Sequence, residues 1–323
     1  MEQYPFDLLD HADASNGAEL LGRRNGQQRD LQQDAPRFRP GVLLKTAIHT
    51  ALAVGEPLLL TGEAGTGKTQ AAYYVAHQLG LGKVLHFQVK SGSTAQDLLY
   101  HFDHVGYFRE ANLSKGTNTP PPNKMDFITK GELWWALESD KPRVLLIDEI
   151  DKAPRDFPND LLHELDQMKF KVPELKLGDK EFVVGENNPV RPLVFITSNS
   201  ERRLPEAFLR RCTFHHIAFD AALLEEVKDA HRKDFEILGD DLLNMAMRRF
   251  LRLREHHHLR KVPATGEFLV WLRVMALAAG TDATTLQLLL AQLDDDDREL
   301  PYLGVLLKDR HDLETVAENR FDE

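Results

Sequence analysis

The chain has 323 residues, of which 40 are Lys or Arg and 51 are Asp or Glu, so its formal charge is −11 with neutral histidines. A hydrophobic content of 42% and a charged content of 28% are typical of a globular protein and exclude an intrinsically disordered one. The acidic balance argues against a protein whose whole surface binds nucleic acid, but it leaves room for a local basic channel. The single cysteine, Cys212, excludes a fold held by internal disulfides.

The length fits about two domains. Apolar runs are too short to cross a bilayer, and the acidic first residues lack the order of a signal peptide. We therefore expect a cytoplasmic protein without a membrane segment. Residues 1–40 are polar and contain turn-forming residues, which predicts an N-terminal arm or short helices packed against the main domain.

Residues 41–219 alternate between helical and strand patterns. Apolar residues at helical spacing predict a helix over 42–54, and a second helix is expected to end at Gln78. A loop is predicted over 114–124, which contains three consecutive prolines. Short apolar runs predict buried strands at 57–61, 84–89, 144–147, 193–197 and 213–219. This alternation predicts an α/β domain with a parallel sheet covered by helices on both faces.

Residues 220–323 show helical patterns only. Helices are predicted over 221–232, 240–257, 266–279 and 284–293. The chain is therefore expected to continue, after the α/β domain, into a small all-helical domain with a C-terminal tail.

A phosphate-binding loop is predicted between the first strand and the helix that follows it. The segment 62–69 reads GEAGTGKT, which satisfies G-x-x-x-x-G-K-[ST] in the required strand–loop–helix context. Glycines allow successive backbone N–H groups to converge on a polyphosphate, while Lys68 supplies charge to its outer oxygens and Thr69 a hydroxyl for Mg²⁺. The predicted nucleotide-binding residues are Gly62, Glu63, Ala64, Gly65, Thr66, Gly67, Lys68, Thr69 and Gln70.

Two adjacent acids end the aliphatic strand at 144–147. Asp148 fits the strand-terminal carboxylate that holds Mg²⁺ in phosphate-loop proteins. Side chains alternate along a strand, so Glu149 is expected to point to the opposite side, where it would deprotonate a water that attacks the γ-phosphate. Capping of the next helix is the alternative role for the acids at 148 and 151. Together with the phosphate loop, the pair predicts ATP hydrolysis.

Two later segments carry further polar candidates. Asn199 follows the strand at 193–197, at the sheet edge where ligands of α/β folds bind, and is expected to contact the γ-phosphate or the attacking water. Arg210 and Arg211 end the short segment LPEAFLRRC at 204–212. Either one is a candidate arginine finger, a guanidinium inserted beside the γ-phosphate of a neighbouring subunit.

In this order, the segments resemble the AAA+ ATPases and, within them, the MoxR-like group. GEAGTGKT matches the Walker A motif, LLIDEID at 145–151 the Walker B motif, FITSN at 195–199 the sensor 1 strand, and LPEAFLRRC the arginine-finger helix. The resemblance spans about residues 42–293. It implies a P-loop domain with a helical lid, ATP and Mg²⁺ as cofactors, and a homo-oligomeric ring, commonly a hexamer. By position, Arg211 aligns best with the finger, and Arg210 competes with it.

The group's lid carries a sensor 2 arginine at the start of its third helix, where this chain has none. Arg260, Lys261 and Arg273 are the possible substitutes. The resemblance to the MoxR-like group rests on the wording of LPEAFLRRC, on the long segment between Val89 and Arg143, and on the Asp-Leu-Leu at 97–99.

The resemblance implies remodelling or activation of a protein client, in some relatives beside a partner with a von Willebrand A domain. Four aromatics, Tyr100, Phe102, Tyr107 and Phe108, are candidates for gripping a polypeptide in a pore, with packing against the insertion's own core as the alternative. Residues 169–188 form a second candidate pore loop or a plain hairpin. An AAA+ motor or loader acting on DNA or RNA and an ATP-switched assembly scaffold with little turnover remain alternative functions.

Overall fold

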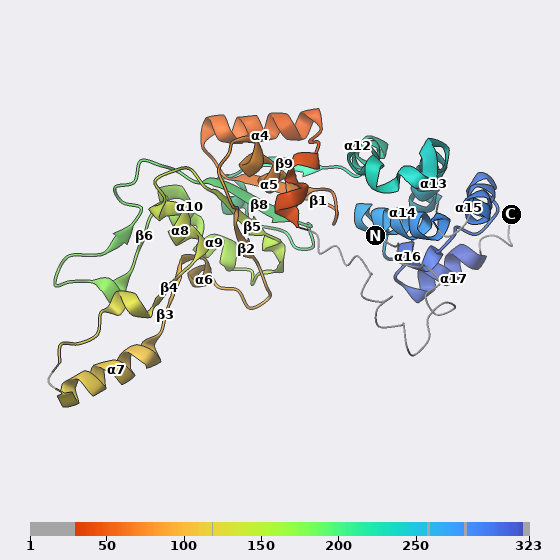
Figure 1. The fold of residues 1–323 in the computed structure, drawn as a ribbon. Coiled ribbons are helices and arrows are strands. Elements are labelled where there is room, and N and C mark those ends of the chain that lie inside the picture. The colour runs from red at the N-terminus through yellow and green to blue at the C-terminus, as the bar shows by residue number, and fades with distance from the viewer. Residues whose placement is uncertain (1–29, 118, 257–258, 281–282, 319–323) are drawn as a thin grey trace. The chain divides into compact units, whose positions relative to one another are not determined.

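The computed structural model describes residues 30–117, 119–256, 259–280 and 283–318 (Figure 1). They form two compact units. The α/β unit comprises residues 31–63 and 67–217, and the helical unit comprises residues 30, 64–66 and the described residues from 218 onward. Most of the predicted N-terminal arm, residues 1–29, lies outside the described residues. Its described end forms two short helices, α3 (Leu31–Asp34) and the 3₁₀ helix η1 (Ala35–Arg37).

A five-stranded sheet with strand order β2-β5-β8-β1-β9 is the centre of the α/β unit. All four strand pairs are parallel, which confirms the predicted sheet. Because parallel strands share one carboxyl edge, residues at the ends of β1, β5 and β8 meet there. The strands are β1 (Leu58–Gly62), β2 (Leu85–Gln88), β5 (Val144–Asp148), β8 (Leu193–Ser198) and β9 (Thr213–Ile217).

Helices cover both faces of this sheet, because alternate strand residues are apolar on each side. Leu58 and Leu60 of β1 pack with α4 (Val42–Val54) and α5 (Lys68–Gln78). Leu59, between them, belongs to the core of the opposite face. That second core includes α6 (Ala95–Leu99), α8 (Glu132–Glu138), α9 (Phe157–Asp160), α10 (Leu162–Gln167) and α11 (Glu206–Leu209). Burial on both faces explains why each strand reads as a continuous apolar run.

Two small antiparallel pairs extend the α/β unit. Strand β3 (Tyr100–Phe102) pairs with β4 (Ile128–Lys130), and between them lie α7 (His104–Thr117) and the 3₁₀ helix η2 (Lys124–Phe127). Figure 1 shows α7 projecting away from the sheet. The loop predicted over 114–124 is wrong in its first part, because α7 continues through Thr117 before the prolines at 120–122 exclude a helix.

Residues 169–188 form the plain hairpin that was one of the two expectations for them. Strand β6 (Phe170–Lys171) pairs with β7 (Val183–Val184), and the 3₁₀ helix η4 (Pro173–Leu175) lies in the connection. Leu177 in the connection is 81% exposed.

The helical unit contains the four predicted helices, with ends shifted by no more than one residue. Trp271, Phe250 and Phe268 are fully buried in its core, and the indole N–H of Trp271 donates to the carbonyl of Pro301 over 2.5 Å. Its elements are α12 (Ala221–His231), the 3₁₀ helix η5 (Arg232–Leu238), α13 (Gly239–His256), α14 (Thr265–Ala279), α15 (Ala283–Asp294), α16 (Leu303–Leu306) and α17 (Arg310–Glu318). Among the described residues, no helix combines the length and apolar character needed to span a bilayer.

Candidate functional site

The loop between β1 and α5 has the geometry expected of a phosphate-binding loop. Nζ of Lys68 donates to the carbonyl oxygens of Gly62 and Glu63 over 2.8 and 2.7 Å, so the lysine at the start of α5 closes the loop. Gly67 has φ of 91°, and a Cβ at this residue would lie 2.7 Å from the ring of Phe38. Both the backbone conformation and the close ring therefore require glycine at this position. Ala64, Gly65 and Thr66 continue the chain through the turn.

Lys68 is 5% exposed and interacts electrostatically with several nearby carboxylates. Burial lowers the pKa of its ammonium group, while the negative charges of Asp148, Asp151 and Glu149 oppose that shift. A buried cation at the start of a helix suits an anionic ligand, because the positive end of the helix dipole acts in the same direction. The next two side chains point to different partners. Thr69 faces the acidic end of β5, whereas the amide of Gln70 donates to the carbonyl of Leu31 over 2.9 Å.

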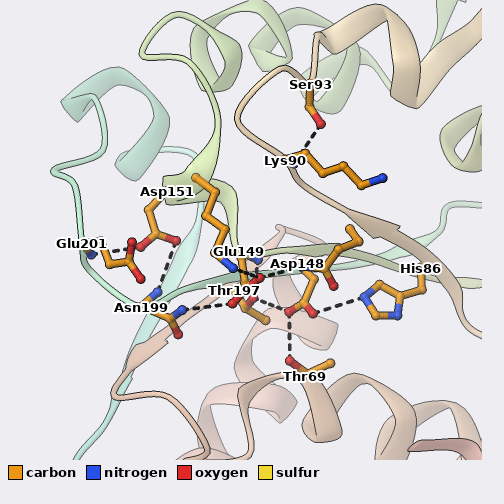
Figure 2. A network of polar contacts seen from close by, with 12 residues as sticks. Thr69, His86, Lys90, Ser93, Asp148, Glu149, Asp151, Thr197, Asn199 and Glu201 are labelled. Carbon is orange, nitrogen blue, oxygen red and sulfur yellow. Dashed lines mark hydrogen bonds and ion pairs between the residues drawn. The ribbon is translucent and has the colours of Figure 1, made fainter. Parts of the chain in front are cut away.

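Asp148, at the carboxyl end of β5, has three side-chain partners (Figure 2). Its Oδ1 accepts from the hydroxyls of Thr69 over 2.9 Å and Thr197 over 2.5 Å, and its Oδ2 lies 3.2 Å from Nε2 of His86. Burial alone would raise the pKa of Asp148, but the hydrogen bonds from His86, Thr197 and Thr69 outweigh it and hold the pKa below its usual value. The carboxylate therefore stays ionised although its residue is only 5% exposed.

The donor set around Asp148 fits Mg²⁺. This ion prefers hard oxygen ligands and commonly takes one or two protein groups, with phosphate oxygens and waters as the rest. Thr69 and Asp148 present a hydroxyl and a carboxylate oxygen within 2.9 Å of each other, beside Lys68.

Contrary to expectation, the direction of the Glu149 side chain is not set by the alternation of side chains along strand β5. Strand β5 ends at Asp148, and Glu149 adopts a left-handed backbone conformation with φ of 60°, which is costly for a residue with a side chain. Its N–H donates to the hydroxyl of Thr197 over 2.8 Å. Three cationic or amide groups bind its carboxylate: Gln88 over 2.7 Å, Lys152 over 2.5 Å and Asn199 over 3.2 Å. The tertiary contacts, not the pleat, therefore set its direction.

Asn199 lies beside Glu149, as Figure 2 shows, and its loop is tied to a second acid. The carboxylate of Asp151 accepts the backbone N–H groups of Asn199 over 3.3 Å and of Glu201 over 2.9 Å. Asp151, which is 3% exposed, thus holds the loop after β8 against the end of β5. This role differs from the helix cap that was its alternative reading.

Arg210 and Arg211 make different contacts. Arg211 donates to the carboxylate of Asp166 over 2.6 Å and to the carbonyl of Ala207 over 2.9 Å, which ties the end of α11 to α10. The side chain of Arg210 is 80% exposed and lies 3.8 Å from the carboxylate of Glu206. Both guanidinium groups therefore lie at the surface, but Arg210 is the less tightly held of the two.

Five residues that make contacts in this site were not predicted: Tyr73, His86, Gln88, Lys152 and Thr197. His86 and Gln88 occupy alternate positions of β2, so both lie on the face that meets Asp148 and Glu149, and Tyr73 of α5 lies 2.9 Å from His86. Polar residues at alternate positions of a strand next to the acidic strand are a detectable signal. It was missed because 84–89 was considered only as a buried strand.

The aromatic cluster proposed for a pore is largely internal. Tyr100 and Phe102 are only 4% and 7% exposed, and Tyr107 is half-buried against Phe102 and Phe127. Only Phe108, 63% exposed on α7, remains accessible. Trp134 is buried, whereas its neighbour Trp135 is 50% exposed, with the ammonium group of Lys130 over its ring.

The candidate sensor 2 residues all belong to the helical unit. Arg260 and Lys261 are exposed, and their own backbone N–H groups donate to the carboxylate of Asp312. Arg273 is exposed on α14. Their role stays a prediction.

Comparison with known proteins matches residues 57–212 to the family described as AAA domain (dynein-related subfamily). The matched segment contains β1, the phosphate loop, β5, β8 and α11. A solved structure described as a "putative ATPase" from Cytophaga hutchinsonii ATCC 33406 is 16% identical, with a TM-score of 0.37, over 90% of this chain and 92% of that one.

Proposed function

We propose that this chain, which carries an AAA domain at residues 57–212, is an AAA+ ATPase that hydrolyses ATP in a Mg²⁺-dependent reaction within a homo-oligomeric ring. The observation that carries this proposal is the set of contacts joining Thr69, Asp148, Glu149 and Asn199 beside the buried Lys68. These contacts, all at one edge of the sheet, support roles for the residues in phosphate binding, metal binding and water activation.

Each residue has a role that its contacts support. Lys68 and the loop N–H groups bind the triphosphate, and Thr69 and Asp148 hold Mg²⁺, which neutralises charge on the phosphate oxygens. Glu149 accepts the proton of the attacking water, and Asn199, whose amide already contacts Glu149, positions that water or the γ-phosphate.

One carboxylate oxygen of Glu149, Oε2, already accepts hydrogen bonds from both Lys152 and Gln88. A water can be deprotonated at that oxygen only after it loses part of this binding, and the other oxygen already accepts from Asn199. We therefore infer that low basal turnover accompanies this arrangement and that subunit assembly raises turnover through the finger arginine, Arg211 or Arg210.

The proposed client is a protein, as in the MoxR-like group, with a von Willebrand A domain partner as one form of it. The exposed apolar residues of α7, Val105, Phe108 and Leu113, support a polypeptide partner for the projecting arm. Nucleic acid is less favoured, because Lys171 of the hairpin pairs with Glu181 over 2.7 Å and is neutralised there. A scaffold with little turnover is the remaining alternative.

The test is the ATPase rate per subunit as a function of protein concentration, with the mass in ATP followed by light scattering. We expect specific activity to rise steeply as higher assemblies form, because a shared site needs the neighbour's arginine. Single-stranded DNA and an unfolded protein are added separately at the assembling concentration.

A monomer that hydrolyses ATP at a concentration-independent rate would overturn the ring. ATP-driven assembly without turnover would favour the scaffold, and stimulation by DNA alone would favour the nucleic-acid motor.

A further inference from the structure

Strand β2 brings a histidine against the carboxylate proposed to hold the metal. His86 pairs in register with Leu146 of β5, and its ring reaches Oδ2 of Asp148 at 3.2 Å. The hydroxyl of Tyr73, on α5, lies 2.9 Å from the other ring nitrogen, Nδ1. Three elements are thus joined in one chain of contacts from α5 through β2 to β5.

The hydrogen-bond pattern assigns the protons along this chain. An ionised carboxylate only accepts, so Nε2 of a neutral His86 carries the proton and donates it to Asp148. Nδ1 is then an acceptor, and the Tyr73 hydroxyl donates to it. Tyr73 is 9% exposed and packs edge-on against the His86 ring, with ring centroids 6.0 Å apart, so the imidazole orientation is restricted on both sides.

The two oxygens of Asp148 are used differently. Oδ1 faces the hydroxyls of Thr69 and Thr197, whereas Oδ2 faces Nε2 of His86. Because the side chain of Asp148 is only 8% exposed, little water is available to replace a lost donor at Oδ2. Residues that hydrogen-bond to a metal-binding carboxylate fix its orientation and thereby raise metal affinity.

We propose that Tyr73 and His86 are positioning residues that orient Asp148 so that Oδ1 is directed at the Mg²⁺ of the nucleotide. This inference rests on the proposed function, because it concerns the same metal site. It adds that metal affinity is set from outside the Walker motifs, by one helix and one neighbouring strand.

The test measures binding of a fluorescent, non-hydrolysable ATP analogue to the full chain while Mg²⁺ is titrated. We expect His86→Ala to raise the Mg²⁺ concentration at half-saturation by about 10-fold or more. Tyr73→Phe removes only the hydroxyl from a ring that stays packed, and it is expected to give a smaller rise in the same direction. In EDTA, both variants are expected to bind the analogue as the unaltered chain does.

Two further variants separate positioning from a general structural effect. His86→Gln keeps an N–H donor near the position of Nε2 and is expected to recover most of the Mg²⁺ affinity. His101→Ala, at an exposed histidine of β3, is the matched control and is expected to leave the titration unchanged.

An unaltered Mg²⁺ titration in both His86→Ala and Tyr73→Phe would overturn the inference alone. Equal weakening with Mg²⁺ and in EDTA would also overturn it, because the loss would then lie in the nucleotide pocket or the fold. If the unaltered chain failed to bind the analogue under any condition, the proposed function itself would be wrong, and this inference with it.

Discussion

Thr197 donates its hydroxyl proton to Oδ1 of Asp148 over 2.5 Å, from strand β8 to the neighbouring strand β5. The same hydroxyl oxygen accepts the backbone N–H of Glu149 over 2.8 Å. One fully buried side chain therefore fixes both acids, the carboxylate of the first and the left-handed backbone of the second. The positions of the two acids at the sheet edge therefore depend on Thr197.

Replacing Thr197 by Val keeps the shape of the side chain but leaves an N–H and a carboxylate short of a partner. We expect a loss of about 1–3 kcal/mol in the free energy of unfolding, together with reduced ATP turnover. Denaturant unfolding and a steady-state ATPase assay measure the two effects. Thr197→Ser keeps the hydroxyl and should lose much less of both; a Val variant as stable and active as the unaltered chain would contradict the assignment.

Glu149→Gln removes the proposed base and retains a side chain of the same size. Since general base catalysis typically contributes about 10²–10⁴-fold, we expect turnover to fall by that order while ATP stays bound. Equilibrium binding and single-turnover hydrolysis test this directly. Glu110→Gln, at an exposed acid of α7, is the control for loss of a charge. Rapid hydrolysis by the Glu149 variant would show that another group activates the water.

Arg211→Ala is expected to abolish turnover of the assembled protein without weakening ATP binding to a single subunit. The structure adds a competing requirement, because Arg211 also holds α11 to Asp166. Asp166→Ala breaks the same ion pair while keeping the guanidinium of Arg211, so it separates the two effects. If Arg211 acts as the finger, the assembled Asp166→Ala variant is expected to keep its ATP turnover. If Arg211→Ala turns over normally, Arg210, exposed at 80%, takes the role, and Arg210→Ala should then abolish turnover.

Cys212 should be chemically inert in the folded chain. Burial raises the pKa of its thiol to about 12, with the charges of Glu56 and Asp166 adding to the shift. At pH 8 only about one thiol in 10⁴ is ionised, so reaction with an aromatic disulfide reagent should be about a thousandfold slower than for a free cysteine. Because the chain has a single cysteine, full reaction after addition of denaturant gives the reference. Prompt labelling of the native protein would contradict this.

Much of the fold follows from local patterns. Five short apolar runs predicted the strands of the parallel sheet, and helical spacing predicted four helices of the second unit to within one residue, although η5, α16 and α17 were not predicted. The phosphate loop was predictable for the same reason: Gly67 and Lys68 act through backbone conformation and a short reach to Gly62, all within seven consecutive residues. A sequence pattern can predict such contacts because the interacting groups are close together along the chain.

Contacts between distant segments were decided by the tertiary structure alone. His86 and Asp148 are joined only because β2 pairs with β5, and Thr197 reaches Glu149 only because β8 lies on the other side. Burial of Tyr100 likewise depends on stacking against Phe170 and on an edge-on contact with Trp134, both from later elements. The sequence alone determined which residues bear the chemistry of phosphate and metal binding. Strand order and packing decided which groups hold them in place, because hydrogen bonds across a sheet join residues that no local pattern connects.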